Sequence, residues 1–394
     1  MHASRSALFH LQACCFAAGN HGEVKVTVYD APTLVVAHQF ALTSLTGVTV
    51  LLRSLLPEIG TVNPHIRVVY LNLDEHSMPG ASLTRLWAAS HHRLEFVGVN
   101  LQIDRHLNRS IECFEVCRQM GVPAYLWAHD YWSQHERIVR RLVEELGVTL
   151  LASTPTVRDG LDRDNFSARL VQVGISLDNL VIDTTRPPRQ VPFVVGTAGR
   201  LVRRKRLIDV VRAFRLAGLG DAAELRLRLL PSLVYPANLD GKILDEVMDE
   251  VTALRAAGAT VVVDHSATPQ HDYGVYSAYV CTSDYEGFSM PPIEAIYCGC
   301  PTFMSDIPAH RAIASLLHPD DWQDVLFPVG DMSTLAALMR DEALTRRREA
   351  RLQSRLSEIR SLIEAQWSVQ GMARALLDTL GRLSPGVYRD VFRE

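Results

Sequence analysis

The sequence predicts an α/β protein with two arrays of parallel strands, and three features indicate this. Short apolar runs, typical of buried strands, alternate with segments of helical spacing along most of the 394 residues. A chain of this length exceeds what one hydrophobic core usually holds, so two domains are expected. A polar, proline-rich segment at 183–192 separates the two arrays and indicates where the first domain ends.

The expected elements alternate from strand to helix, which predicts doubly wound parallel sheets with crossover helices. The expected strands are Leu34–His38, Ile66–Leu71, Glu95–Val99, Ala124–Ala128, Thr149–Ala152, Phe193–Thr197, Glu224–Leu230, Thr260–Val263, Ala278–Cys281 and Thr302–Met304. Helical spacing is found at Val48–Leu56, Arg109–Met120 and Ile208–Leu216, and in the tail from Ser333 onward.

The domain boundaries follow from the proline-rich segment and from the tail. Residues 1–188 are predicted to form the N-terminal domain, in which 1–30 are an additional arm or strand. Residues 189–366 are predicted to form the C-terminal domain. A last helix is expected within 367–394, because apolar residues recur at helical spacing after Trp367.

Composition excludes several classes of protein. The 47% hydrophobic and 21% charged residues are those of an ordinary globular protein, and a net charge of −4 gives no basic field for nucleic acid. No apolar run approaches the roughly 18 residues that span a bilayer. Seven cysteines without paired C-x2-C sets argue against a disulfide framework and a zinc site. Cys113 and Cys117 are therefore expected to be buried thiols in a reducing cytoplasm.

The most informative segment carries two carboxylates eight positions apart, Glu286 and Glu294. An apolar run at Ala278–Cys281 precedes them, and two prolines favour a helix start between them. Glu286 is thus expected on the turn that leaves a strand, where ligands bind in open α/β sheets. Backbone N–H groups on this turn would form an anion site beside hydroxyl-accepting carboxylates, which suits a sugar nucleotide. These N–H groups belong to Gly287, Phe288, Ser289 and Met290.

The stretch Ser283–Thr302, followed by Ser-Asp-Ile-Pro at 305–308, resembles the E-x7-E motif of the family-4 retaining glycosyltransferases. In that family the first Glu binds hydroxyls of the donor sugar and the second binds the ribose of the nucleotide. The resemblance implies these roles for Glu286 and Glu294. It also implies the GT-B fold, in which two Rossmann-like domains face a cleft and the terminal helix crosses back onto the N-terminal domain.

Gly196–Arg206 resembles the family's G-R-L-x-x-x-K-G segment, whose Arg and Lys bind the donor diphosphate. The resemblance assigns these roles to Arg200 and Lys205, and only three lysines occur in this arginine-rich chain. Arg206 stands where the family has Gly, which is a departure from the pattern. Fixed cations would stabilise the charge of the leaving diphosphate. No Asp-x-Asp stands at a strand end, so neither a metal nor another cofactor is expected.

Two N-terminal segments also resemble the family. Thr43–Val48 resembles its G-G-V loop, with Gly47 at the second Gly, near the diphosphate, and Thr46 in place of the first. Ala128–Trp132 resembles the His-Asp-Tyr-Trp of many bacterial members, which implies a catalytic role for His129 near the donor sugar. Contacts with the sugar or the acceptor are expected from Asp130, Tyr131, Trp132 and Gln102, the last standing after the preceding strand where several relatives have a His.

The sequence therefore predicts a metal-independent retaining glycosyltransferase, which moves a sugar from a nucleoside-diphosphate sugar to a hydroxyl of a glycan, lipid-linked or small-molecule acceptor. Two alternatives stay open. A donor-binding regulatory or scaffold protein without turnover is compatible with Arg206, Thr46 and Gln102, and an epimerase or phosphorylase shares the implied fold. A cytoplasmic location is expected. Peripheral contact with the inner membrane face and the oligomeric state are left open.

Overall fold

The computed structural model divides the chain into two compact units. Unit 1 contains Met1–Gly174 and Val369–Glu394, and unit 2 contains Ile175–Ser368. The predicted N-terminal arm and the predicted boundary after residue 188 lie outside the described residues and stay predictions. The residues that the structure describes are 31–42, 47–76, 78–101, 107–177, 180, 192–230, 237–265, 273–317 and 322–383.

The sheet of unit 1 has six strands, all parallel, in the order β2-β1-β3-β4-β5-β6. Strand β1 reads Thr-Leu-Val-Val-Ala-His and is buried throughout, as expected of a parallel strand covered on both faces. The strands of this sheet are β1 Thr33–His38, β2 Arg67–Asn72, β3 Leu94–Val99, β4 Ala124–Ala128, β5 Thr149–Ala152 and β6 Ala168–Leu170.

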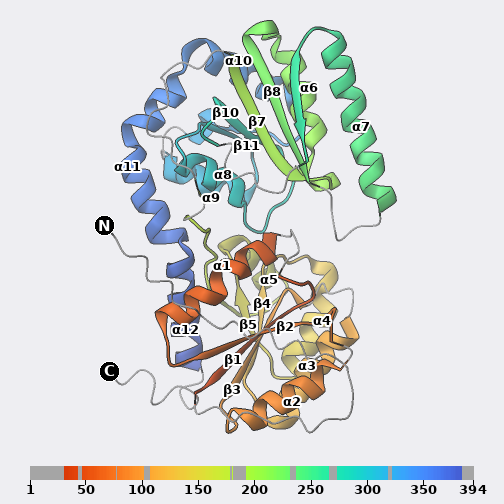
Figure 1. Cartoon of the computed structure of the whole chain (residues 1–394), viewed down its shortest axis with the longest axis vertical. Helices are drawn as coiled ribbons and strands as arrows, with labels where there is room; N and C mark the ends of the chain where they lie inside the picture. The colour runs from red at the N-terminus through yellow and green to blue at the C-terminus, as the bar shows by residue number, and fades with distance from the viewer. Residues whose placement is uncertain are drawn as a thin grey trace, which may run out of the picture. The chain divides into compact units, whose positions relative to one another are not determined.

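Helices connect these strands, and their ends follow local rules. For example, the Thr154 side chain accepts a hydrogen bond from the Val157 N–H and Pro155 follows it, which starts α5. The last described helix, α12, packs against α1 within this unit (Figure 1). The helical elements are α1 Gly47–Val62, α2 Pro79–Ala89, α3 Leu107–Met120, η2 Ser133–His135, α4 Glu136–Arg140, η3 Arg141–Glu145, α5 Pro155–Arg163 and α12 Val369–Leu383.

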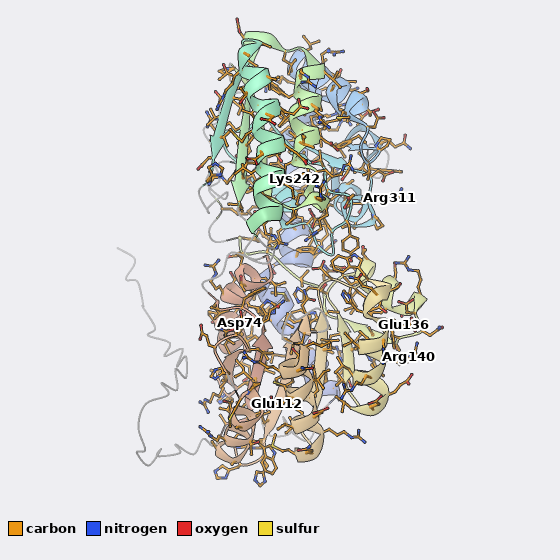
Figure 2. The ribbon with its side chains drawn as sticks, turned by 90° about the vertical axis from the view of Figure 1, so that its right-hand side faces the viewer. Asp74, Glu112, Glu136, Arg140, Lys242 and Arg311 are labelled. Atoms are coloured by element: carbon orange, nitrogen blue, oxygen red, sulfur yellow. The ribbon has the colours of Figure 1, made fainter. Side chains whose placement is uncertain are left out.

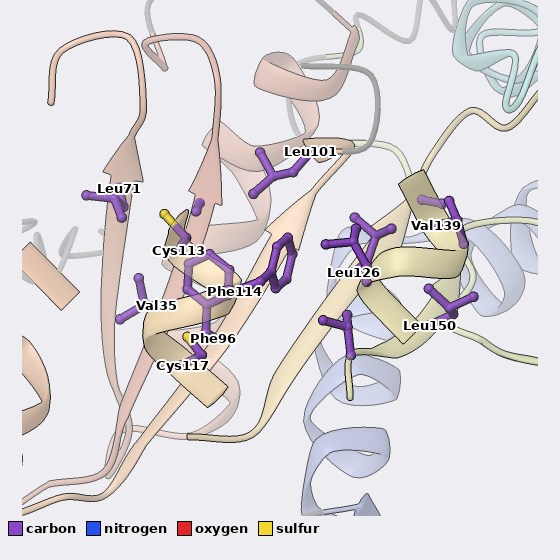
Figure 3. Close-up of a cluster of buried hydrophobic side chains, with 14 of the residues drawn as sticks. Val35, Leu71, Phe96, Leu101, Cys113, Phe114, Cys117, Leu126, Val139 and Leu150 are labelled. Atoms are coloured by element: carbon purple, nitrogen blue, oxygen red, sulfur yellow. The ribbon is translucent and has the colours of Figure 1, made fainter. Parts of the chain in front are cut away.

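The core of unit 1 lies between its sheet and the helices that pack on it, and Figure 3 shows part of it. The rings of Phe96 on β3 and Phe114 on α3 meet edge to face, with centroids 5.3 Å apart. Cys113 and Cys117 point into the same cluster as buried thiols. Burial raises the pKa of Cys117 to about 12. The prediction of buried thiols is confirmed for this pair.

The sheet of unit 2 also has six parallel strands, in the order β12-β11-β10-β7-β8-β9. The chain passes from β7 outward to β9 and then returns to place β10 on the other side of β7. The strand order therefore reverses between β7 and β10, and ligands of open α/β sheets bind at such reversals. The strands are β7 Phe193–Arg200, β8 Ala223–Leu230, β9 Thr260–Asp264, β10 Ala278–Cys281, β11 Thr302–Ser305 and β12 Leu326–Phe327.

Helices of unit 2 complete this second α/β array, and α6 and α7 lie side by side next to β7 and β8 (Figure 1). The Asp331 side chain accepts a hydrogen bond from the Thr334 N–H and so starts α10. The helical elements are η4 Arg203–Lys205, α6 Leu207–Ala217, η5 Gly220–Ala222, α7 Ala237–Ala256, α8 Met290–Tyr297, α9 Pro308–Leu317, η7 Trp322–Asp324, α10 Met332–Thr345 and α11 Arg347–Trp367.

The prediction of two doubly wound parallel sheets is confirmed, and every expected strand is present. The sequence patterns do not predict two edge strands, β6 and β12. Strand β12 has only two residues, and β6 is largely exposed, so neither produces an apolar run.

Charged side chains occupy the described surface. On α4, Arg140 Nη2 lies 2.7 Å from Glu136 Oε1, and both are labelled in Figure 2. Because both side chains are more than 40% exposed, this ion pair adds little to stability. Within the described residues, no helix combines the length and the apolar character that crossing a bilayer requires.

Candidate active site

The loops that follow β7 and β10 meet at the strand-order reversal of unit 2. Because the strands are parallel, their carboxyl ends share one edge of the sheet. The Thr282 hydroxyl donates to the carbonyls of Lys205 and Arg206, at 2.9 and 3.0 Å. The Asp284 N–H donates to the Arg204 carbonyl at 2.9 Å. These bonds hold the two loops together although about 80 residues separate them in the chain.

Glu286 lies between two cations at this junction. Lys205 Nζ is 2.5 Å from Glu286 Oε1, and Arg204 Nη1 is 3.1 Å from Oε2. The Ser283 hydroxyl donates to Oε1 at 2.6 Å. Arg204 also donates to the Tyr285 carbonyl at 2.9 Å, so its guanidinium is held on the turn itself. The carboxylate is only 5% exposed, and its oxygens are therefore satisfied by protein groups.

The charges around Glu286 determine its protonation state. Burial alone would raise the pKa of this carboxyl. The positive charges of Lys205 and Arg204, together with hydrogen bonds from Lys205 and Ser283, lower the pKa to about 2. Glu286 is therefore ionised throughout the physiological pH range. Lys205 and Arg204 share this one carboxylate, so positive charge remains for an anionic ligand, although the Asp284 carboxyl also faces Arg204 and Arg206.

Arg206 keeps the turn that a glycine would make. Its backbone adopts φ 49° and ψ 37°, the left-handed conformation that costs a non-glycine residue about 1 kcal/mol. Arg206 Nε lies 2.7 Å from Asp209 Oδ2 in the first turn of α6. The departure from the family pattern at this position therefore changes the side chain and leaves the path of the backbone intact.

Glu294 lies in the middle of α8 and is 7% exposed. The hydroxyl of Tyr273, which is fully buried, donates to Glu294 Oε2 at 2.7 Å. Burial raises the pKa of Glu294 to about 7, and the hydrogen bond from Tyr273 offsets only part of this rise. The two acidic residues of the motif therefore differ in charge near neutral pH, with Glu286 ionised and Glu294 close to half protonated.

The turn before α8 holds the other predicted donor-binding residues. Ser289 is the N-cap residue of α8, but its side chain makes no capping bond to the helix. Gly287 and Ser289 are buried, while Phe288 and Met290 are half-buried. The Phe288 ring meets Trp367 edge to face at 6.2 Å. Pro at the second and third helical positions removes two N–H groups, so the anion site at this helix start is smaller than its position alone indicates.

In unit 1, the predicted His129 follows β4 and is held by its backbone. The His129 and Asp130 N–H groups donate to Asn100 Oδ1 at 2.6 and 3.2 Å. Asn100 itself has φ 54°, a conformation that Asn tolerates better than most residues. Burial, with a smaller effect from His38, lowers the pKa of His129 to about 3. The imidazole is therefore neutral, and its buried Nε2 has no hydrogen-bond partner in the structure.

The neighbouring predicted residues differ in accessibility. Tyr131 is 5% exposed, and its hydroxyl donates to Asp164 Oδ2 at 2.6 Å, so little of its ring can face a ligand in this state. Trp132 is half-buried, and Gly47, at the start of α1, is exposed. Thr46 and Gln102 lie outside the described residues, and their predicted contacts stay predictions.

The structure thus brings Lys205 and Glu286 together, while Arg200 ends β7 at the same edge of the sheet and is half-buried. Sequence reasoning missed Arg204 and Tyr273. The sequence has four consecutive cations at 203–206 and does not indicate that Arg204, among them, contacts Glu286. Tyr273 stands beside a variable loop, and no motif marks it as a partner of Glu294. Among the described residues, no group of three or more His, Cys, Asp or Glu is arranged to hold a metal ion.

Comparisons with known proteins concern one matching domain and the fold. The family model described as glycosyl transferases group 1 matches residues 184–355. Sucrose-phosphate synthase from Thermosynechococcus elongatus shares 14% identity at a TM-score of 0.68, over 90% of this chain and 100% of that one. HepE from Anabaena, solved with UDP and glucose, shares 13% identity at a TM-score of 0.66, over 88% and 98%. No curated protein sequence is significantly similar to the chain.

A trehalose-6-phosphate synthase is a third structural neighbour, with 13% identity and a TM-score of 0.64 over 89% of this chain and 99% of that one. These likenesses establish the GT-B fold for the two sheets. The matched domain coincides with the sheet that carries Glu286, Lys205 and Arg204. The chain therefore has the GT-B fold, and its residues 184–355 are similar to the group 1 glycosyl transferases.

Proposed function

We propose that this protein is a retaining glycosyltransferase of the family-4 type, which transfers a sugar from a nucleoside-diphosphate sugar to a hydroxyl acceptor. The observation that carries the proposal is the position of Glu286 between Lys205 and Arg204 at the strand-order reversal. Two cations and one acid at this point match the two chemical halves of such a donor. The diphosphate requires positive charge, and the sugar requires hydrogen-bond acceptors.

Donor binding would exchange one set of partners for another. In the structure Lys205 and Arg204 both pair with Glu286. A diphosphate competes for both cations because it carries more negative charge than one carboxylate. Glu286 would then be released to accept hydrogen bonds from sugar hydroxyls. The same cations would stabilise the leaving diphosphate as the bond to the sugar breaks.

Glu294 would accept hydrogen bonds from the hydroxyls of the ribose. Its Oε2 already receives the Tyr273 hydroxyl, which limits the directions in which the carboxyl can turn. A carboxyl can accept a hydrogen bond from a hydroxyl whether it is protonated or ionised, so a pKa raised to about 7 is compatible with this role. Arg200, at the end of β7, would add a further positive charge to the diphosphate site.

Retention is supported by the protonation states of the candidate bases. Glu286, with a pKa of about 2, and His129, with a pKa of about 3, are weak bases at neutral pH. A departing phosphate oxygen that takes the acceptor proton on the donor's front face would make a stronger base unnecessary. One structural neighbour, the trehalose-6-phosphate synthase, is described in terms of glycosyl transfer with retention.

The first donors to test are UDP-sugars, since HepE and an Escherichia coli structural neighbour were solved with UDP or a UDP-sugar. Calorimetric titration with nucleoside diphosphates and their sugars would measure binding, with EDTA present to test the expected independence from metal. NMR of the product would give its anomeric configuration. Failure to bind any nucleotide would overturn the proposal. Binding without transfer to any of a panel of glycan, lipid-linked and small-molecule acceptors would favour the donor-binding regulatory protein.

A further inference from the structure

A buried histidine lies beneath the turn that carries Glu286. His310, in the first turn of α9, is fully buried, and no role has been assigned to it. Its Nδ1 is 2.8 Å from the Ser305 carbonyl oxygen, and its Nε2 is 3.1 Å from the Ser289 hydroxyl. A carbonyl oxygen can only accept a hydrogen bond, so Nδ1 carries the proton. In the neutral ring, Nε2 then accepts from Ser289.

The same histidine is connected to the other end of the turn. Ser305, whose hydroxyl lies 3.2 Å from His310 Nδ1, donates this hydroxyl to the Ser283 carbonyl. Ser283 in turn donates its own hydroxyl to Glu286 Oε1 at 2.6 Å. His310 therefore reaches Ser289 directly and Ser283 through Ser305. These two serines are the ends of the segment 283–289, which carries the Glu286 carboxylate.

Two observations indicate that these bonds determine the shape of the turn. The side chains of Ser283, Ser289 and Ser305 are buried, so water cannot replace a lost partner. The Cys281 thiol lies 3.7 Å from the Ser283 hydroxyl and 3.9 Å from the Ser289 hydroxyl, but a thiol is a weaker hydrogen-bond partner than an imidazole or a carboxylate. Ser289 also occupies an N-cap position, where a serine hydroxyl normally accepts from the helix backbone. Here the hydroxyl makes no such bond and is held by His310 instead.

We propose that His310 is a positioning residue, which holds both ends of the segment 283–289 and thereby orients Glu286 for the donor. The effect of His310 on sugar transfer rests on the proposed function, whereas its effect on the shape of the segment 283–289 does not. His310 itself is too deeply buried to touch a substrate. Its effect on transfer must pass through Glu286 and through the backbone of the turn.

Three substitutions separate the two hydrogen bonds of the imidazole. In His310→Asn the amide nitrogen reaches the place of Nδ1 and can still donate to Ser305, but nothing reaches Ser289. In His310→Gln the longer amide reaches the place of Nε2 and can still accept from Ser289. His310→Phe retains a ring of similar size and loses both bonds.

Hydrogen exchange measured by mass spectrometry reports the local stability of the turn and does not require an active enzyme. For His310→Phe we expect exchange across 283–290 to accelerate by about tenfold or more. The Asn and Gln variants should show smaller increases, because each keeps one bond. Glu342→Gln is the control for general destabilisation. Glu342 is a fully buried carboxyl whose partners, the N–H groups of Arg348 and Glu349 and the guanidinium of Arg348, lie outside the turn.

Sugar transfer gives the second readout. His310→Phe should lower kcat about 10- to 100-fold with a smaller change in KM, because the acid that binds the sugar is misaligned in the transition state. A combined His310→Phe, Ser289→Ala variant should be little worse than His310→Phe alone, since His310→Phe already removes the bond through which Ser289 is held. Glu342→Gln should retain its kcat.

The outcomes are distinguishable. Unchanged exchange at 283–290 in His310→Phe, or acceleration spread equally over α10 and α11, would overturn the positioning role. Local acceleration with unchanged kcat would overturn its consequence for transfer. If the wild-type protein neither binds nucleotides nor transfers a sugar, the proposed function fails, and exchange at 283–290 still decides whether His310 shapes the turn.

Discussion

Lys205 Nζ lies 2.5 Å from Glu286 Oε1, so the cation predicted to bind a diphosphate is held by the carboxylate predicted to bind a sugar. The positive charge of Lys205 is a main reason that the pKa of Glu286 falls to about 2. The pair is therefore a pre-formed charge distribution whose members can exchange partners when a donor arrives. The predictions below test the two residues and their surroundings.

Removal of Lys205 should impair transfer strongly. For Lys205→Ala we expect a loss of about 2–4 kcal/mol in transition-state stabilisation, comparable to the removal of other charge-stabilising groups. That loss appears as a decrease in kcat/KM. Lys242→Ala is the matched control, since Lys242 is exposed on α7 and is labelled in Figure 2. Equal activity in the two variants would contradict the role of Lys205.

Substitution of the two acids should impair different steps. We expect Glu294→Ala to abolish nucleotide-sugar binding, because the ribose loses its acceptor. Glu286→Ala should mainly lower turnover, because the sugar loses its alignment while the nucleotide keeps its contacts. Calorimetry measures the first effect and steady-state kinetics the second. Near-normal activity in both variants would show that the site is assigned incorrectly.

The difference between what the sequence predicts and what it misses has a physical cause. The turn at Glu286 is predictable because an apolar run, a glycine and two prolines give a strand end and a helix start within a few residues. The partners of the two acids are not predictable in this way. Arg204 reaches Glu286 because β7 and β10 are neighbours, and only the strand order brings such distant segments together. Tyr273 precedes β10 and Glu294 follows it, so their contact depends on how the chain folds around this one strand.

The raised pKa of Glu294 should make stability depend on pH. Burial moves this pKa from 4.5 to about 7. Between these values the unfolded chain has released the proton and the folded protein retains it. The free energy of unfolding therefore falls as pH rises through this window, by about 3 kcal/mol at most. In Glu294→Gln this loss is absent, so the stability of the variant relative to wild type should increase with pH.

Urea unfolding at about pH 5 and about pH 7.5 measures this difference. Glu286→Gln is the control, because a pKa of about 2 leaves Glu286 ionised in both the folded and unfolded states over most of the window. Its stability relative to wild type should change little with pH there. A Glu294→Gln difference that is independent of pH would contradict a neutral, buried Glu294.

Substitutions at Arg206 should reveal the cost of its left-handed backbone. Arg206→Ala keeps the unfavourable φ of 49° and loses the ion pair with Asp209, so it should lower the free energy of unfolding by about 1 kcal/mol. Arg206→Gly loses the same ion pair but removes a strain of about 1 kcal/mol, and should remain close to wild type. Urea unfolding compares the two variants. A glycine variant less stable than the alanine variant would contradict the left-handed turn.

Arg204 provides the sharpest comparison, because its neighbour Arg203 has the same chemistry in a different place. The Arg204 side chain is 21% exposed and lies 3.1 Å from Glu286, whereas Arg203 is 66% exposed and lies 3.8 Å from Glu246. Arg204→Ala removes one of two cations from the proposed diphosphate site and should lower kcat/KM by about 10- to 100-fold. Arg203→Ala should stay within about twofold of wild type, because an exposed pair contributes little. If both variants lose kcat/KM equally, the four cations at 203–206 act through their combined charge and not through Arg204 in particular. If both variants retain the kcat/KM of wild type, Arg204 does not belong to the site.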